Sequence, residues 1–424
     1  MLSNFRSIAE SKLKRFLLYG SEEIVYFSGG RVQYGYFLGS NLTSLRNLLN
    51  QVDKKKISEW VKFVQEEKVA SHVCIVPLVV SECCKLSGWK EEAFEMALTV
   101  LRTDKEFLMF CKFSFEILPE IGNGPLVTKF IREWYLRLDC WELVEIVSER
   151  PCCYGWYHRD LIKLANVNSS CPSMGAAFAY AIGGVELMNQ QYGNNAEARD
   201  VVEHLNRFEA FKSKTDTDEA ITENGASTHN IHTSNQTLVR EKQLRNAFQK
   251  NVKITTKNIT VIVDCYKLSR SYCRCSPSVQ ADIAAAQIAL YFGNASANNR
   301  VLVFKEIKYQ YLQRGTTVDE LVNNIGTDTR ECSSTREIGL YLSPKNGETL
   351  YTDLFVVIGA SINHENYIKY VQDHRRDKSR APKFAFCSLG GILNDRTIKY
   401  DKDVLLTSGF DDKMCDIISA FSTL

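Results

Sequence analysis

The sequence predicts a chain of the α + α/β class, in which an α-helical solenoid is followed by a doubly wound parallel sheet. Two observations predict this fold. Apolar residues recur at helical spacing through the first half, and short β-branched runs alternate with helical stretches in the second half. A polar segment, residues 212–236, lies between the two halves. We therefore expect two domains, residues 1–250 and residues 251–424.

Successive amphipathic helices are expected in the first domain. Apolar residues fall at i, i+3, i+4 and i+7 in segments 57–64 and 94–101, which places them on one helical face. Thr103 with Glu106 matches a capping box, and Gly124–Pro125 predicts a further helix start. Helices this short are not stable alone, so each must bury its apolar stripe against its neighbours, as repeat solenoids do.

The helical run ends in a polar stretch. Ala198–Phe211 is its last expected helix, and Ser, Thr, Asn and Asp are frequent in residues 212–236. Such a composition buries too little apolar surface to form a core, so it predicts a linker or a mobile loop. A short helix, Leu238–Phe248, is expected before the second domain.

The second domain has the pattern of a parallel sheet. Helical stretches, Val279–Phe292 and Glu365–Asp373, lie between continuous apolar runs, which is typical of a sheet covered on both faces. Ligands of such sheets bind beyond the carboxyl ends of the strands, here near Asp264 and Gly359. The expected strands are Asn258–Asp264, Val301–Phe304, Leu354–Ile358 and Phe384–Cys387.

Composition and charge narrow the function classes. The 424 residues are 45% hydrophobic and 24% charged, which is ordinary for a globular protein. A formal net charge of +2 leaves no strongly basic domain, so RNA contact must come from local patches, and DNA is not an expected partner. No apolar run approaches the roughly 18 residues that span a membrane, so no membrane partner is expected.

The 14 cysteines indicate a reducing compartment. The start of the chain, Met1 to Arg15, is polar and basic and has no secretory character. No cysteine spacing is that of a zinc site, so free structural thiols are expected. We expect the protein in the cytoplasm, and also in the nucleus.

Asp264 closes the first strand of the second domain and is the candidate metal ligand. A metal-ion-dependent adhesion site would need Asp-x-Ser-x-Ser there, because a hard cation requires several oxygen ligands. Tyr266 and Leu268 occupy the two serine positions. A degenerate site with no bound metal and no other cofactor is therefore expected.

Catalytic motifs are absent from the sequence. No G-x-G-x-x-G, Walker motif, H-E-x-x-H or nucleophile elbow occurs. His229 and His232 lie in the polar segment and are expected to be solvated. We therefore expect a protein that is not an enzyme, and an α/β enzyme using Asp264 is the least favoured of three hypotheses.

Residues 153–164, CYGWYHRDLIKL, form the candidate RNA-binding segment. Aromatic residues alternate with cationic ones, which suits single-stranded RNA, because bases stack on rings and phosphates pair with cations. The candidate contact residues are Tyr157, His158, Arg159 and Lys163. The alternative interpretation is a turn leading into a helix, with Trp156 in the core.

Motifs along almost the whole chain resemble the Ro autoantigen family of TROVE-domain proteins. GWYHRDLIKLANV (Gly155–Val167) and GFDDKMCDIISAF (Gly409–Phe421) are the most specific of them. RFLLYGSEEIVYF (Arg15–Phe27), LVREKQLRNAF (Leu238–Phe248) and ITVIVDCY, the first strand, are also similar to family motifs, in the same order.

The resemblance implies a HEAT-like α-helical solenoid closed into a ring by a von Willebrand A-like domain. It implies binding of small noncoding (Y-like) or misfolded RNAs, a role in RNA quality control and no catalysis. His158 and Arg159 match a family surface segment implicated in RNA binding. The chain departs from the family after Phe248, where it passes almost directly to the first strand, and at Gly359, where the family has an acidic ligand.

These departures indicate a divergent or shortened member. The family's threonine ligand aligns with Thr327 or with Arg330. The rival function is a protein-interaction scaffold, in which the helical part and a degenerate adhesion-type domain both bind protein partners and no RNA.

Overall fold

The computed structural model describes the chain in two compact units. One comprises Met1–Leu48, Val69–His72 and Asn230–Leu424, and is called here the sheet unit. The other comprises Leu49–Lys68 and Val73–His229, and is called the helical unit. The described residues are 2–28, 40–117, 124–222, 255–274, 276–296, 298–305, 308–326, 335–343, 351–363, 365–377, 382–391 and 400–423.

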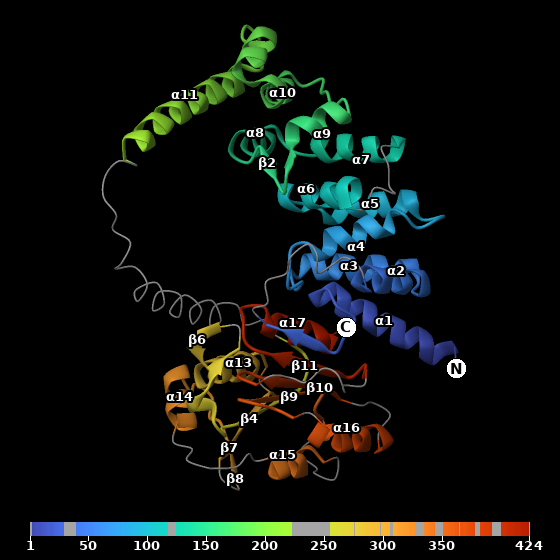
Figure 1. Ribbon diagram of the computed structural model, residues 1–424, viewed down its shortest axis with the longest axis vertical. Coiled ribbons are helices and arrows are strands. Elements are labelled where there is room, and N and C mark those ends of the chain that lie inside the picture. The colour runs from blue at the N-terminus through green and yellow to red at the C-terminus, as the bar shows by residue number, and fades with distance from the viewer. Residues whose placement is uncertain are drawn as a thin grey trace. The chain divides into compact units, whose positions relative to one another are not determined.

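The helical unit is a succession of helices, most of them short (Figure 1). Each helix packs mainly against those one or two positions along the chain, as in a solenoid. After α2 (Ser40–Gln51), which spans the unit boundary, its helices are α3 (Lys54–Glu66), α4 (Ile75–Cys83), α5 (Lys90–Val100), α6 (Asp104–Lys112) with the π-turn η2 (Phe113–Ile117), α7 (Pro125–Leu136), α8 (Cys140–Glu149), α9 (His158–Leu164), α10 (Pro172–Tyr192) and α11 (Arg199–Thr222).

Local sequence signals place these helices correctly. The predicted capping box of Thr103 and Glu106 begins α6, and both of its reciprocal hydrogen bonds are formed. Gly124 is the N-cap of α7, with a proline at its first position. The helix interfaces are rich in aromatic rings, and Phe107 stacks on Trp134 with ring centroids 4.0 Å apart.

The polar stretch that was predicted to be a linker needs a correction. Helix α11 continues through residues 212–222, which we expected to be irregular. Lys, Glu and Ala are good helix formers, so low hydrophobicity alone did not mark the end of the helix. Residues 223–236 and the expected helix Leu238–Phe248 lie outside the described residues.

The sheet unit holds a seven-stranded sheet in the order β1-β11-β10-β9-β4-β7-β8. All neighbouring strands are parallel except the hairpin of β7 and β8. The strands are β1 (Val25–Phe27), β4 (Ile259–Asp264), β7 (Arg300–Lys305), β8 (Lys308–Tyr311), β9 (Leu354–Gly359), β10 (Lys383–Ser388) and β11 (Val404–Ser408). Four of the five long strands were predicted, and β11 was not.

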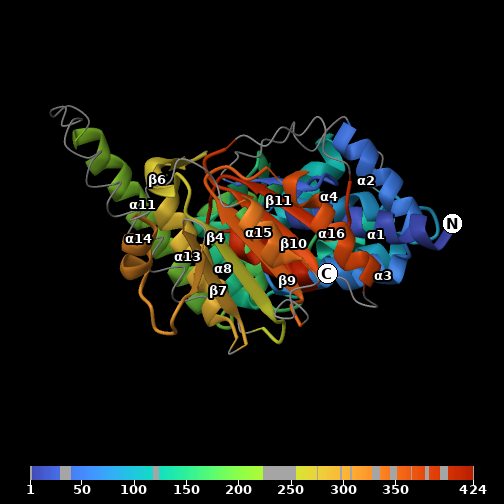
Figure 2. The same cartoon turned by 90° about the horizontal axis from the view of Figure 1, so that it is seen from below.

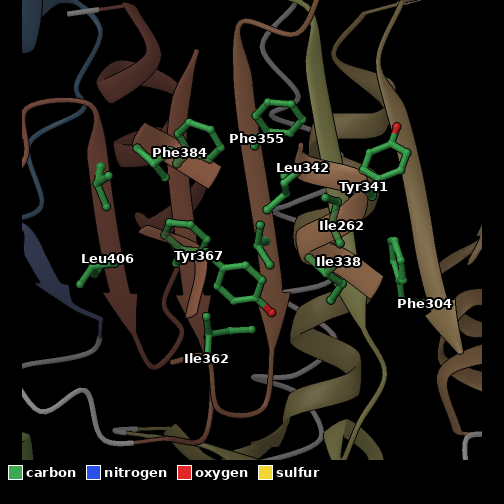
Figure 3. Packing of buried hydrophobic residues seen from close by; sticks show 14 of the residues in the cluster. Ile262, Phe304, Ile338, Tyr341, Leu342, Phe355, Ile362, Tyr367, Phe384 and Leu406 are labelled. Carbon is green, nitrogen blue, oxygen red and sulfur yellow. The ribbon is translucent and has the colours of Figure 1, made fainter. Parts of the chain in front are cut away.

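Helices cover both faces of this sheet (Figures 1 and 2). On one face, α15 and α16 close an apolar core that includes Phe355 and Phe384 (Figure 3). Helix α13 packs against the central strands on the other face, where α17 contacts β11 and α1. The helices are α1 (Leu2–Tyr19), α13 (Ala281–Asn294), α14 (Val318–Gly326), α15 (Thr335–Leu342), α16 (Glu365–Asp377) and α17 (Met414–Thr423).

The predicted fold class is confirmed, because a helical part is combined with a mostly parallel, doubly covered sheet. The expected division into residues 1–250 and 251–424 differs from the units observed. Met1–Leu48 belongs to the sheet unit, because β1 pairs with β11 and α1 packs on α17. Among the described residues, no helix is both long and apolar enough to cross a membrane.

Candidate functional site

The candidate RNA-binding segment forms a tight hairpin followed by a short helix. β2 (Cys152–Cys153) pairs antiparallel with β3 (Trp156–Tyr157). Tyr154 and Gly155 connect them with φ angles of 57° and 86°. Two consecutive positive φ values are typical of the type I′ turn, whose twist matches that of the flanking strands. The hairpin therefore places Tyr157 immediately before the first residue of α9.

Two contacts from α6 and the π-turn hold the hairpin in place. Lys112 Nζ donates a hydrogen bond of 2.8 Å to the carbonyl oxygen of Tyr154. The half-buried ring of Trp156 lies 5.1 Å from that of Phe115, centroid to centroid. Trp156 thus packs against the π-turn, which agrees in part with the alternative interpretation of this residue as a core residue.

His158 is buried, and its expected role needs a correction. Its side chain is 1% exposed. Nδ1 lies 2.7 Å from the hydroxyl of Tyr135, and Nε2 has no hydrogen-bond partner among the described residues. Burial lowers the pKa of His158 to about 4, opposed by the nearby Asp104 carboxylate. In this conformation the imidazole is neutral, faces the core and cannot contact a ligand on the surface.

Three of the four predicted contact residues lie on the surface, and we call them the aromatic–basic surface: Tyr157, Arg159 and Lys163. Tyr157 is 46% exposed, and the guanidinium carbon of Arg159 lies 5.5 Å from its ring centroid. Arg159 and Lys163 are exposed and are one helical turn apart on α9. An aromatic face beside two cations can stack on a base and pair with phosphates.

The electrostatics of this surface are modest. Arg159 Nε lies 3.1 Å from Asp160 Oδ1, and both side chains are about half exposed. Such an exposed pair is worth little, roughly 0–1 kcal/mol, so a phosphate can compete for the guanidinium. Arg159, Asp160 and Lys163, the exposed charged residues of α9, together carry a net charge of +1.

Sequence reasoning missed two cations that belong to neighbouring helices. Lys112 reaches the hairpin from α6, as described above. Arg132 on α7 donates a 3.0 Å hydrogen bond to the carbonyl oxygen of Ala165, the C-cap residue of α9. Both cations are fixed by a backbone carbonyl next to the predicted segment. No signal within residues 153–164 points to them, since their proximity comes from helix packing.

Asp264 lies at the carboxyl edge of the sheet, as predicted for the last residue of a parallel strand. The residue is 3% exposed, and its Oδ1 accepts a hydrogen bond of 3.3 Å from the backbone N–H of Tyr266. β4 is paired with β7 on one side and β9 on the other. Asp264 therefore stands at the topological switch point, where ligands of doubly wound sheets bind.

The groups described around Asp264 do not make a ligand set for a hard cation. Leu268 is fully buried in one of the two serine positions. At Gly359, an added Cβ would lie 2.7 Å from Ile362 Cδ1 and 3.6 Å from Asp264 Cβ, so an acidic residue there would displace a buried side chain. Mg²⁺ needs several oxygen ligands in nearly octahedral geometry.

A search of the described residues for clusters of three or more His, Cys, Asp or Glu that could hold a metal finds none. Thr327 and Arg330, the two candidates for the family's threonine ligand, lie outside the described residues. Ser361 and Ser388 offer hydroxyls nearby, each about 2.7 Å from where a Cβ of Gly391 would stand. Neutral hydroxyls alone are weak ligands for Mg²⁺.

A helical solenoid together with a von Willebrand A-like sheet defines the architectural class of this chain. No protein-family model matches the sequence. Among solved structures, the chain is similar to "Crystal structure of Deinococcus radiodurans RO (RSR) protein", with a TM-score of 0.66 and 14% sequence identity. The likeness covers 98% of this chain and 99% of that chain, so it extends across both units.

At 14% identity this likeness shows the fold and leaves the function open. It agrees, at the level of the fold, with the predicted resemblance to the Ro family.

Proposed function

We propose that this chain is a divergent Ro-type, TROVE-domain RNA-binding protein. Its ligands are small noncoding or misfolded RNAs, its role is RNA quality control in the cytoplasm and nucleus, and it performs no catalysis. The proposal rests on the exposed aromatic–basic surface, on a chain whose fold resembles a Ro protein from end to end. An exposed tyrosine beside two exposed cations suits a single-stranded or looped RNA better than a duplex, because unstacked bases can stack on the ring.

RNA binding by this surface is tested by filter binding of a structured small RNA with a single-stranded tail. Arg159→Ala combined with Lys163→Ala should weaken binding at least tenfold, about 1.4 kcal/mol, because two phosphate contacts are lost. The slope of log K against log salt should fall by about 1.4, from about 0.7 per contact. Tyr157→Ala should cost roughly 1–3 kcal/mol through lost stacking, with little change in that slope.

Lys55→Ala combined with Lys62→Ala is the matched control. It removes the same two charges from exposed positions on α3 and should leave RNA affinity almost unchanged. Equal losses in both double variants would mean that only net charge matters and that α9 is no site. If no RNA binds the unaltered chain even at low salt, the protein-interaction scaffold becomes the better function.

We propose further that the protein uses no Mg²⁺. Adding millimolar Mg²⁺ should not raise the melting temperature of the full chain, because Tyr266, Leu268 and Gly359 occupy ligand positions. Thermal denaturation with Mg²⁺ and with an equal ionic strength of Na⁺ measures this. A Mg²⁺-specific rise that disappears in Asp264→Asn, which keeps the side chain's shape, would show that the site is intact.

A further inference from the structure

A hollow of about 140 Å³ lies at the amino edge of the sheet, opposite the edge that holds Asp264. It is called here the basic hollow, and its charged lining is Lys14 and Arg15 of α1, Lys383, Lys402, Glu10 and Asp403. Lys383 begins β10, and Asp403 directly precedes β11. All of these residues belong to the sheet unit. A cavity needs roughly 10–15 Å³ to hold one water, so this one has room for a larger ligand.

Arg15 is a buried cation with unused donors. Its side chain is 1% exposed. Nη2 donates to the carbonyl oxygens of Asp401 at 2.6 Å and Val404 at 2.7 Å, which ties α1 to β11. Nε and Nη1 have no acceptor among the described residues. The clamp on β11 accounts for one nitrogen of the guanidinium, and the other two are buried without an acceptor among the described residues.

Aromatic rings surround this guanidinium, and no carboxylate pairs with it among the described residues. Its carbon lies 5.0 Å from the ring centroid of Tyr400 and 5.6 Å from that of Phe421. Cation–π contacts offset only part of the hydration free energy that a buried charge loses. A buried guanidinium with unpaired N–H groups therefore favours the binding of an anion.

Lys383 adds a second cation held within the same hollow. Its Nζ donates a hydrogen bond of 2.6 Å to the carbonyl oxygen of Phe421. The same atom lies 4.9 Å from the ring centroid of Phe421. Burial lowers the pKa of Lys383 to about 8, with a further decrease from Lys14 and an opposing effect of Asp403. The folded chain thus keeps this ammonium in an environment that penalises its charge, and a bound anion would relieve that penalty.

The charges of the lining do not balance. Four cations, Lys14, Arg15, Lys383 and Lys402, stand against two carboxylates, Glu10 and Asp403, which leaves +2. Lys402 Nζ already lies 3.3 Å from Asp403 Oδ1. A doubly charged oxyanion would neutralise the remainder, and a phosphate group carries about −1.5 to −2 at neutral pH with several strong acceptor oxygens.

We propose that the basic hollow binds a phosphate group, either as free inorganic phosphate or as the end of a phosphate monoester. A tetrahedral oxyanion can accept from a guanidinium and an ammonium at once, which a monovalent halide does less well. This site is separate from the aromatic–basic surface, and its occupation does not depend on RNA binding at α9.

Isothermal titration calorimetry of the full chain with sodium phosphate tests the proposal, at constant ionic strength and with chloride as the reference ion. Phosphate should bind, and Lys383→Met should weaken binding at least tenfold. Arg15→Lys keeps the charge and loses the fork of donors, so it should weaken binding similarly. Circular dichroism checks that each variant is folded. Lys369→Ala, an exposed lysine on α16, should bind phosphate like the unaltered chain.

Two outcomes would overturn the site: no phosphate binding above the chloride reference, or unaltered binding in folded Lys383→Met. If Arg15→Lys unfolds, Lys383→Met and Lys402→Ala still decide the matter, because neither removes a clamp on the backbone of β11. Adenosine monophosphate, with adenosine as its control, separates the two sources. Displacement of phosphate by the monophosphate identifies an ester ligand, and absence of displacement identifies free phosphate.

Discussion

His158 is buried, although an imidazole is a side chain that could contact RNA. The residue type suits RNA contact, and the motif around it resembles a family RNA-binding segment. However, the first turn of α9 places its side chain against Tyr135 of α7, whose hydroxyl lies 2.7 Å from Nδ1. His158 is therefore buried at the start of α9, and of these two neighbours only Arg159 is exposed at the proposed RNA-binding surface.

The pH dependence of stability should report this burial. The pKa of His158 is about 4 in the folded chain and about 6.5 when unfolded, so the unfolded state binds more protons between these values. Stability should therefore fall as pH decreases from about 6.5 to about 4, by on the order of 3 kcal/mol from this group. Urea unfolding at pH 7 and pH 4 measures it.

Two variants make that measurement specific. His158→Gln removes the titrating group and should lose much of this pH dependence, at the cost of lower stability at pH 7, since the Tyr135 hydroxyl loses its partner. His204→Gln, at an exposed histidine on α11, should keep the pH dependence of the unaltered chain. The same pH response in both variants would contradict a buried neutral His158.

At the scale of elements, the β2–β3 hairpin sets the position of the aromatic–basic surface. Its turn depends on two residues with positive φ, and only Gly155 accepts that conformation without strain. Tyr154 adopts it as well, with its carbonyl oxygen held by Lys112. The position of Tyr157 on the surface therefore depends on Gly155 in the turn and on Lys112 of α6.

Replacing Gly155 tests the hairpin. Gly155→Ala should destabilise the helical unit by about 1 kcal/mol, because alanine at φ 86° is strained. RNA affinity should also decrease, since Tyr157 shifts with the turn. Gly124→Ala is the control, because its φ is negative and nothing lies within 4 Å of the added Cβ. Chemical denaturation and filter binding check both, and equal effects of the two substitutions would refute the role of the turn.

At the scale of the whole molecule, the start of the chain completes a domain built mostly from its end. β1 pairs with β11 in register, from Val25 opposite Leu406 to Phe27 opposite Ser408. Arg15 adds hydrogen bonds to the carbonyls of Asp401 and Val404, more than 380 residues away in sequence. The sheet unit is therefore discontinuous, and a boundary at residue 250 cuts through its structure.

A fragment experiment follows from that topology. Residues 251–424 alone should be unstable or prone to aggregate, because the edge of β11 and the α1-facing side of α17 become exposed. Adding a peptide of residues 1–48 should restore cooperative unfolding, measured by circular dichroism and thermal denaturation. A fragment 251–424 that melts cooperatively without the peptide would show that the first 48 residues are dispensable for the sheet.

Residue spacing alone determined much of the fold. The capping box at Thr103, the proline start of α7 and the strand that ends at Asp264 were all predicted from residues within one turn or one strand. Caps, amphipathic stripes and apolar runs act within a few residues, so they can be recognised without knowledge of distant contacts. The order of a helical part before a parallel sheet follows from the same signals.

Tertiary structure alone decided which residues share a site. β1 is three residues long and becomes a strand only by pairing with β11. His158 and Arg159 are neighbours in sequence, yet one is buried and the other exposed, since successive helical residues differ in direction by about 100°. Arg15 and Lys383 meet in one hollow only after folding. Periodicity shows that a face will be buried, but burial partners at long sequence separation are fixed by packing.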